Sequence, residues 1–386
     1  MVMIKGVSGK SILDSRKDKT ILVTIKTDVG TFSASSPTGK STGKYEKKCY
    51  KKNLDGDIKA LKGHSDYFSE EHLDSFDDLR RVEDIIADSV GANTLFAFEG
   101  AVLKAMAKEK KKEVWQLINP DAKNMPRLLG NCVGGGKHST TDRKPDFQEF
   151  ILIPNLKSVE KSYEKNKNAK KQVEKLLEKK DAKFTGKRTD ESAWMTSLNE
   201  KEVLEVLKET GLDLGVDIAA SGFYKRKKYL YQNPMLKRTP EEQMGYLTNL
   251  IKNFNIYFNE DPFEEEDFES FAKLLAKFPD SLIVGDDLIV TNYKRLKKAV
   301  EKKSVNAIIV KPNQCGSLLE VKRVCKLAKE NNIKLAFSHR SGETDETILA
   351  DLAFGFGADF FKCGIEGDVR EGKILRLIEI ERGLKN

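Results

Sequence analysis

The second half of the sequence places an acidic or basic residue directly after each of six short apolar runs. These residues are Asp217, Glu260, Asp286, Lys311, His339 and Lys362. The last five are separated by 23 to 28 residues, about the length of a β-strand with a returning helix. Each is therefore expected at the carboxyl end of a parallel strand. In a β/α barrel these ends form the rim that carries the active site, so three carboxylates, two lysines and a histidine would meet at one opening.

The chain of 386 residues is long enough for two domains with buried cores. Residues 1–45 contain β-branched runs separated by Gly and Pro, with a turn at 28–30 that suggests a hairpin. Residues 79–117 carry apolar residues at three- and four-residue spacing, which predicts helices. We therefore predict a small α+β domain over residues 1–118, followed by a linker.

A second domain is predicted over residues 126–386. It begins with a glycine-rich polar stretch at 130–146, expected to be a long loop, which leads into a strand at 147–154. A further loop is expected at 186–197. Strands and helices then alternate to the end of the chain, which indicates a parallel sheet. The length and period favour closure into a TIM-like β/α barrel, with an open doubly wound sheet as the alternative.

The composition is typical of a soluble globular protein, with 39% hydrophobic and 33% charged residues. No apolar run reaches the roughly 18 residues of a membrane span, and the first residues lack a signal-peptide core. We therefore expect a cytoplasmic protein with no membrane contact. The net charge of +8 comes mostly from lysine, with runs at 44–52, 108–113 and 165–180. Because these runs also contain acids, we interpret them as solvated helix faces and not as nucleic-acid patches.

The three acids of the predicted rim point to a metal ion. Asp217, Glu260 and Asp286 would repel one another strongly in a partly buried site. A hard divalent cation such as Mg²⁺ removes this repulsion, because it binds oxygen ligands and keeps positions open for substrate. For a single acid the alternative is a helix N-cap or a surface residue.

The basic residues of the rim suggest proton transfer and anion binding. Lys311 follows an apolar run, and a buried lysine beside other cations loses its proton more easily and can act as a base. Lys362 is placed similarly, although either lysine could instead be a structural ion-pair partner. Arg340 and Ser341 could grip a phosphate or a carboxylate. His339 is either part of this site or a core histidine with satisfied hydrogen bonds.

Several longer stretches closely resemble the enolase family. They are GDDLIVTNYKRLKKAV at 285–300, IIVKPNQCGS at 308–317 and SHRSGETDET at 338–347, with shorter matches in EDPFEEEDF, DFQEFILIP and GKSTGKYE. This resemblance implies an N-terminal α+β capping domain on a modified β/α barrel that starts with two antiparallel strands. It also implies the reversible dehydration of 2-phosphoglycerate to phosphoenolpyruvate, a step of glycolysis.

The resemblance implies two Mg²⁺ ions per active site. Asp217, Glu260 and Asp286 would hold the first ion. Ser41, in the GKSTG loop, would close over the site and help to bind the second. Lys311 would be the base that removes the C2 proton of the substrate, and this role requires a neutral amine with a lowered pKa.

The resemblance also assigns residues around the leaving group and the substrate. Glu191, in TDES, matches the acid that protonates the leaving hydroxyl, which requires a raised pKa. Glu149 would lie beside it, His138 would lie on a mobile flap, and His339 would line the pocket; with Lys311 these complete the predicted catalytic set. The substrate would be held by Ser41, His138, Gln148, Glu149, Arg340, Ser341 and Lys362.

Three stretches depart from the family pattern. Ser192-Ala193 replaces the glycine pair that follows the acid, the flap reads GGGKHSTTDRKPD, and GIEGDVREG at 364–372 replaces GAP-x-RSER. Two alternatives therefore stay open. One is an enolase-superfamily lyase acting on a related phosphorylated or hydroxy-acid substrate, and the other is a non-catalytic enolase-like binding protein. The family further implies a homodimer or larger homo-oligomer.

Overall fold

The N-terminal part of the protein is an antiparallel sheet packed against helices. In the computed structural model, which describes residues 1–40, 43–68 and 71–385, the strand order of this sheet is β3-β2-β1-β4. The strands are β1 (Val2–Leu13), β2 (Lys19–Thr27), β3 (Gly30–Ser35) and β4 (His72–Leu73). Ile21, Val23 and Ile25 alternate along β2 and are buried, as expected for a strand with one face on a core. The hairpin predicted at 28–30 joins β2 to β3.

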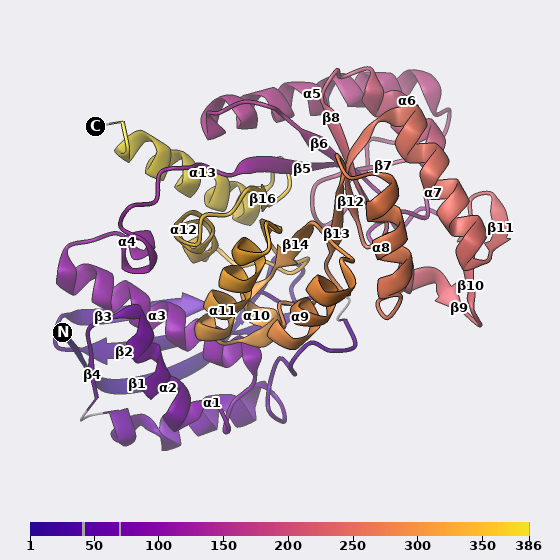
Figure 1. Cartoon of the computed structure of the whole chain (residues 1–386). Helices are drawn as coiled ribbons and strands as arrows, with labels where there is room; N and C mark the ends of the chain where they lie inside the picture. The colour runs from indigo at the N-terminus through magenta and orange to yellow at the C-terminus, as the bar shows by residue number, and fades with distance from the viewer. Residues whose placement is uncertain (41–42, 69–70, 386) are drawn as a thin grey trace.

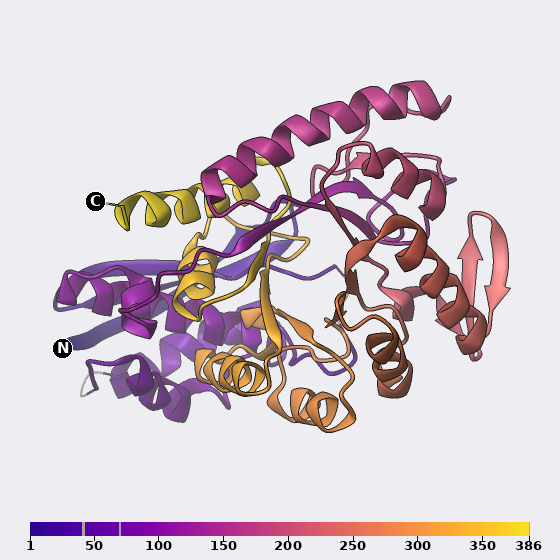
Figure 2. The same cartoon turned by 45° about the horizontal axis from the view of Figure 1, so that its top comes forward.

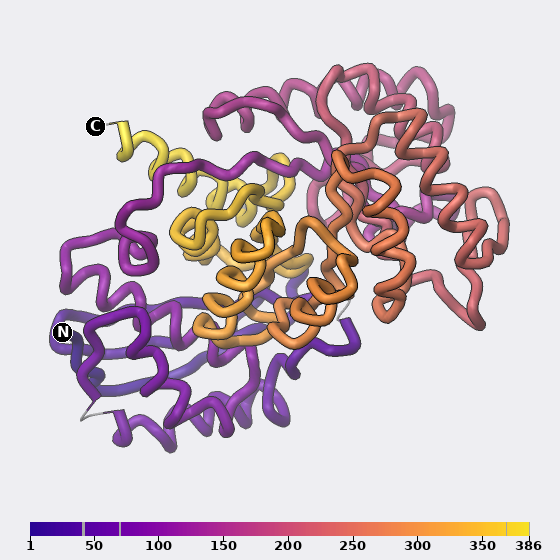
Figure 3. The backbone as a smooth tube through the Cα atoms, viewed as in Figure 1, coloured from indigo at the N-terminus to yellow at the C-terminus, as the bar shows by residue number. Residues whose placement is uncertain are grey.

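The helices of this region connect the sheet to the rest of the molecule. They are α1 (Leu54–Gly63), α2 (Leu79–Ile86), α3 (Ala92–Lys110) and α4 (Val114–Ile118). The long helix α3 packs on β2 and β3 with one face, and it also contacts α10 (Pro312–Cys315) of the C-terminal part. Figure 3 shows how these purple N-terminal segments run beside the orange ones, although they are far apart in sequence.

The C-terminal part is a closed eight-stranded barrel (Figure 1). Its strands are β5 (Arg127–Gly134), β6 (Glu149–Ile153), β8 (Asp213–Asp217), β12 (Ile256–Glu260), β13 (Leu282–Gly285), β14 (Ala307–Val310), β15 (Lys334–Ser338) and β16 (Phe360–Lys362). Strand β6 is antiparallel to both β5 and β8, and the remaining neighbours are parallel. Parallel pairing of β16 with β5 closes the ring. The predicted modified TIM-like barrel is confirmed, and the open sheet is excluded.

Helices surround the barrel strands on the outside (Figure 2). They are α5 (Val159–Lys180), α6 (Glu200–Lys208), α7 (Pro240–Phe254), α8 (Phe268–Lys277), α9 (Tyr293–Lys302), α11 (Leu318–Glu330), α12 (Ile348–Gly355) and α13 (Asp368–Gly383). A small hairpin sheet projects from this ring and consists of β9 (Tyr224–Lys225), β10 (Lys228–Gln232) and β11 (Met235–Arg238). Among the described helices, none is long and apolar enough to cross a lipid bilayer.

The interior of the barrel is filled by apolar side chains. They are Leu129, Ile151, Ile153, Phe258, Leu282, Val284, Ala307, Ile309, Ala336 and Phe360. Because side chains alternate along a strand, a residue two positions further on points the same way. Phe258 therefore lies beneath Glu260, and Ile309 lies beneath Lys311, so this apolar layer is the floor of the rim.

The sequence prediction was wrong over part of the stretch 130–146. Residues 127–134 form β5, and only the part after Gly134 is a loop. The glycines of β5 serve close packing and not turns. A side chain on Gly130 would place its Cβ 2.5 Å from Cγ1 of Ile365, and one on Gly134 would place it 2.5 Å from Cγ2 of Thr189. The loop expected at 186–197 likewise contains a short strand, β7 (Trp194–Met195), which pairs with β5.

Candidate active site at the barrel rim

The six polar residues that follow the apolar runs all lie at the carboxyl ends of barrel strands. Asp217, Glu260 and Lys362 are the last residues of β8, β12 and β16, whereas Asp286, Lys311 and His339 follow β13, β14 and β15 directly. Four of them, Asp217, Lys311, His339 and Lys362, line a small cavity of about 40 Å³. The other two, Glu260 and Asp286, are ion-paired with the lining residues Lys362 and Lys311. This cavity is lined by Gly39, His138, Gln148, Glu149, Glu191, Asp217, Lys311, Ser338, His339, Arg340, Ser341 and Lys362.

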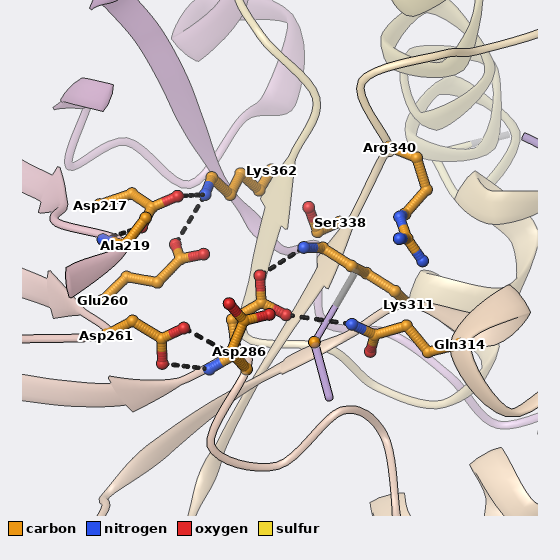
Figure 4. A network of polar contacts seen from close by, with 12 residues as sticks. Asp217, Ala219, Glu260, Asp261, Asp286, Lys311, Gln314, Ser338, Arg340 and Lys362 are labelled. Atoms are coloured by element: carbon orange, nitrogen blue, oxygen red, sulfur yellow. Dashed lines mark hydrogen bonds and ion pairs between the residues drawn. The ribbon is translucent and has the colours of Figure 1, made fainter. Parts of the chain in front are cut away.

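Each rim carboxylate is ion-paired with one of two lysines, Lys362 or Lys311 (Figure 4). The ammonium group of Lys362 donates to Glu260 Oε2 at 2.7 Å and to Asp217 Oδ2 at 3.3 Å, and it lies 3.4 Å from Glu149 Oε2. The ammonium group of Lys311 pairs with Asp286. The buried negative charge is therefore compensated within the protein by two separate cations.

The pKa values of Glu260 and Asp286 shift in opposite directions because their partners differ. Burial raises the pKa of Glu260 well above its usual range, and the nearby Asp217 adds to this effect. Burial also favours the neutral form of Asp286, but the ion pair with Lys311 outweighs it and lowers the pKa of Asp286. For Lys362, burial lowers the pKa, yet Glu149, Glu260 and Asp217 outweigh burial and raise it.

The donor set at the rim fits a hard divalent cation. Oε1 of Glu260 is buried and has no hydrogen-bond partner in the described part of the chain. A buried carboxylate oxygen without a partner is costly, and Mg²⁺ binds such oxygens. An ion placed among Asp217, Glu260 and Asp286 would replace the charge that Lys362 and Lys311 now supply.

Two other groups of potential ligands are more compact than the predicted trio. Within each of them the ligand atoms lie within 4.8 Å of one another. The groups are His138, Glu149 and Glu191, and Asp261, Asp286 and Asp287. The trio is not among them, since Asp286 is turned toward Lys311. In the second group the oxygens of Asp261 already accept the backbone N–H groups of Asp286 and Asp287 at 2.9 and 2.8 Å.

Glu191 also lines the cavity and lies between two imidazoles. Its Oε2 atom is 3.6 Å from His138 Nδ1 and 3.8 Å from His339 Nε2, and it accepts a hydrogen bond from Asn131 Nδ2 at 3.2 Å. Burial raises the pKa of Glu191, but these histidines and the nearby Arg370 outweigh burial and lower it. The expected raised pKa was wrong for Glu191. Burial does raise the pKa of the neighbouring Glu149, to about 8.

The predicted base also differs from expectation in its ionisation. Burial lowers the pKa of Lys311, but the pair with Asp286 outweighs burial, and the pKa is raised to about 12. The expected lowered pKa was therefore wrong for this arrangement, in which the Lys311 ammonium is ion-paired with Asp286. The sequence places Lys311 at the rim but does not reveal which acid it pairs with.

The proposed phosphate-binding residues already have partners in the protein. The guanidinium group of Arg340 contacts Glu46, with Nη1 at 3.1 Å and Nη2 at 3.0 Å from Oε2. Oγ of Ser341 accepts hydrogen bonds from the backbone N–H of Lys40 at 2.7 Å and from Arg16 Nη1 at 3.0 Å. Lys40 and Glu46, from the N-terminal part of the chain, are therefore bound to Ser341 and Arg340 of the rim.

The remaining predicted residues lie around the cavity, with one exception. Gln148 Nε2 donates to Asp217 Oδ2 at 3.3 Å, and His138 lies on the loop after β5 with no hydrogen-bond partner for its Nδ1 atom among the described residues. Ser41 falls outside the described residues. Sequence reasoning did not single out Glu46, Asn131 or Arg370. Glu46 lies within a stretch that resembles the family, GKSTGKYE, but only the contact with Arg340 reveals its importance.

The turn that carries Glu191 forms even though the family's glycine pair is replaced. Ser192 adopts a left-handed backbone conformation with φ of 60°, which favours glycine. The turn is closed by hydrogen bonds from the N–H of Ser192 to the carbonyl of Thr189 at 2.9 Å and from the N–H of Ala193 to Thr189 Oγ1 at 3.2 Å. This departure in sequence therefore leaves Glu191 directed into the cavity.

Comparison with known proteins gives one consistent result. The family described as the enolase C-terminal TIM barrel domain matches residues 122–386. The enolase of Methanosphaera stadtmanae is 34% identical and covers 100% of this chain and 98% of its own. The enolase of Pyrobaculum aerophilum is also 34% identical, over 97% and 94% of the two chains. The enolase of Picrophilus torridus is 33% identical, over 99% of both.

Proposed function

The chain belongs to the enolase family, and on this premise we propose that it catalyses the reversible, Mg²⁺-dependent dehydration of 2-phosphoglycerate to phosphoenolpyruvate. The observation that carries the proposal is the rim itself. At the carboxyl ends of the barrel strands it combines three carboxylates, two lysines, a carboxylate–histidine group and an arginine–serine pair. These are the groups needed to bind a phosphorylated acid, remove a proton from carbon and protonate a leaving hydroxyl.

Charge complementarity would place the substrate. Arg340 and Ser341 suit the phosphate, because a guanidinium group pairs with phosphate oxygens in bidentate geometry. The phosphate would compete with Glu46 for Arg340. Lys362 suits the substrate carboxylate, since its ammonium group already binds carboxylate oxygens in this position.

Asp217, Glu260 and Asp286 would hold the first Mg²⁺, and the second would be bound with the help of Ser41. Bound divalent ions stabilise the charge that develops on the substrate carboxylate when the neighbouring carbon loses its proton. Asp286 cannot serve an ion and the Lys311 ammonium equally well. Once Asp286 is engaged as a ligand, burial of the Lys311 amine would favour its neutral form.

Proton transfer would then proceed from opposite sides of the substrate. Lys311 would take the proton from C2, and the electron pair left behind would move into the C2–C3 bond as the C3 hydroxyl departs. Glu191, with Glu149 beside it, would give that hydroxyl a proton so that it leaves as water. His138 and His339 flank Glu191. The proton shared by the two carboxyls would be held first by Glu149, because burial raises the pKa of Glu149 to about 8.

The absorbance of the enol product tests this proposal directly. The wild type is incubated with 2-phosphoglycerate with and without Mg²⁺, beside Lys311→Ala. Lys334→Ala serves as the matched control, because Lys334 lies at the start of the adjacent strand β15 and its side chain is exposed. We expect Mg²⁺-dependent turnover in the wild type and control, and near-complete loss in Lys311→Ala. A wild type that binds substrate analogues but gives no product would reject the proposed reaction.

The family also supports a homodimer or larger homo-oligomer in the cytoplasm. Light scattering on the purified protein tests the first point, and a mass equal to one chain at micromolar concentration would contradict it. Cell fractionation tests the second, and recovery of the protein outside the cytoplasmic fraction would contradict it.

A further inference from the structure

Arg370 is a buried arginine that links the two halves of the rim. It lies in the first turn of α13 and is 3% exposed. Its Nε atom donates to His339 Nδ1 at 2.9 Å, and Nη1 donates to the carbonyl of Asp190 at 3.0 Å. Nη2 donates to the carbonyls of Arg340 at 3.3 Å and Ser341 at 2.7 Å. One side chain thus contacts the turn of Glu191 and the loop that would bind phosphate.

The contact with His339 determines where this imidazole carries its proton. A guanidinium group can only donate hydrogen bonds, so Nδ1 of His339 must accept and cannot be protonated. The proton of the neutral ring is then on Nε2, the atom that lies 3.8 Å from Oε2 of Glu191. Burial, together with Arg370, also lowers the pKa of His339 and favours this neutral ring. Arg370 therefore sets which nitrogen His339 presents to Glu191.

The backbone contact concerns the turn that carries Glu191. Ser192 holds a left-handed conformation that a non-glycine residue adopts at a cost. Two buried cations bind carbonyls on either side of Glu191, since Arg370 binds that of Asp190 and Lys170 binds that of Ser192. These contacts stabilise a turn from which the family's glycine pair is missing.

We propose that Arg370 is a positioning residue for catalysis, which fixes the Nε2–H tautomer of His339 and holds the Glu191 turn in register with the Arg340–Ser341 loop. The role of these groups in the reaction rests on the proposed function. The geometry itself does not, because the hydrogen bonds of Arg370 exist in the resting protein. A side chain that only stabilised the fold would not need to contact both catalytic segments.

Nitrogen NMR of ¹⁵N-histidine-labelled protein tests the proposal without substrate or metal. The signals of His339 are assigned by their loss in His339→Asn, among the four histidines of the chain. Arg370→Met removes all donors, and Arg370→Lys retains one charge without the fork and remains available if the first variant does not fold. Lys373→Met is the matched control. Lys373 lies one turn further along α13, is equally buried and binds Glu343 and the carbonyl of Thr344, but does not contact His339.

We expect His339 to be the pure Nε2–H tautomer in the wild type and in Lys373→Met, and a mixture of tautomers in both Arg370 variants. With 2-phosphoglycerate, kcat should fall about 100-fold in Arg370→Met, with a smaller rise in KM. An unchanged His339 spectrum in the Arg370 variants would overturn the proposal, as would a kcat within about threefold of wild type. If the wild type itself gives no product, the proposed reaction fails, and the spectra still decide the role of Arg370.

Discussion

The charged rim of the barrel and the apolar layer beneath it are built from the same strands but obey opposite physical rules. Phe258 and Glu260 lie two positions apart on β12, and the next strand repeats the pattern with Val284 and Asp286. The apolar residues are satisfied by packing alone. The acids above them are also buried and need a counter-charge, which Lys362 and Lys311 supply.

The apolar layer makes the charged rim above it more reactive. The apolar floor excludes water from one side of the rim, so charges there interact more strongly than they would in solvent. The same exclusion makes each rim charge costly to the fold unless it is paired. Changes in the floor should therefore alter stability and spare the chemistry, whereas changes in the rim should do the reverse.

The largest effect is expected from Glu260→Gln. This change removes one predicted metal ligand at constant size, and turnover should fall at least about 1,000-fold because the ion is expected to contribute several kcal/mol to the reaction. Calorimetric titration with Mg²⁺ should show weakened binding in parallel. Glu264→Gln is the control, since Glu264 lies beyond the end of β12 and its carboxylate accepts the backbone N–H of Glu266 at 3.0 Å. Undiminished Mg²⁺ affinity in Glu260→Gln would remove Glu260 from the metal site.

Phe258→Ala, in the apolar layer beneath the rim, should affect stability and not turnover. Phe258 is fully buried, and its truncation should lower the free energy of unfolding by about 3–5 kcal/mol. The folded variant should keep kcat within a few-fold of wild type at low temperature. Urea unfolding and turnover measure the two effects separately. Leu236→Ala is the control, because Leu236 lies on the exposed hairpin, and it should change the free energy of unfolding by less than about 0.5 kcal/mol. A loss in Leu236→Ala as large as that in Phe258→Ala would show that burial does not determine the loss of stability.

Glu200 is a buried acid outside the rim, and its ionisation should make the free energy of unfolding depend on pH. Burial raises the pKa of Glu200 to about 7, although its Oε1 atom accepts the backbone N–H of Asp146 at 2.6 Å. A raised pKa means that the folded state holds the proton more tightly than the unfolded chain. Its contribution is therefore complete below about pH 4.5 and is lost as the pH rises to about 7, by about 3 kcal/mol in all.

The variant Glu200→Gln should remove this loss. Urea unfolding at a series of pH values between 4 and 8 should give a flatter stability profile for the variant, with the larger gain at the alkaline end. A profile that keeps the wild-type slope would assign the pH dependence to other groups.

The smallest effect is expected from Ser192→Gly in the Glu191 turn. Glycine adopts a positive φ without strain, and this relief is partly offset by the greater freedom of glycine in the unfolded chain. Stability should rise by less than about 1 kcal/mol with turnover unchanged. A loss of stability in thermal unfolding would indicate that the serine side chain is needed in the turn.

The positions of the rim residues could be predicted because one physical rule links them to the sequence. Each parallel strand is buried on both faces and reads as an apolar run, so the first polar residue after it marks the strand end. This reasoning placed Asp286 and Lys311 on neighbouring strands with no knowledge of the fold.

What the sequence could not provide depends on contacts between distant segments. The glycines at 130 and 134 suggested a loop, but the structure uses them where β5 meets Ile365 and Thr189. The pKa of Lys311 depends on its pairing with Asp286, which strand order and side-chain direction decide together. Arg370 lies in a stretch that departs from the family, and only packing of α13 against the rim reveals its partners.

The central claim is that a base on one side of the rim and an acid on the other act on one substrate. Incubation in D₂O with Mg²⁺ and 2-phosphoglycerate tests it most directly, because exchange of the C2 hydrogen reports the base and product formation reports the acid. We predict that Lys311→Ala abolishes both, whereas Glu191→Gln retains exchange at C2 and loses dehydration. Exchange at C2 in Lys311→Ala at the wild-type rate would contradict the account.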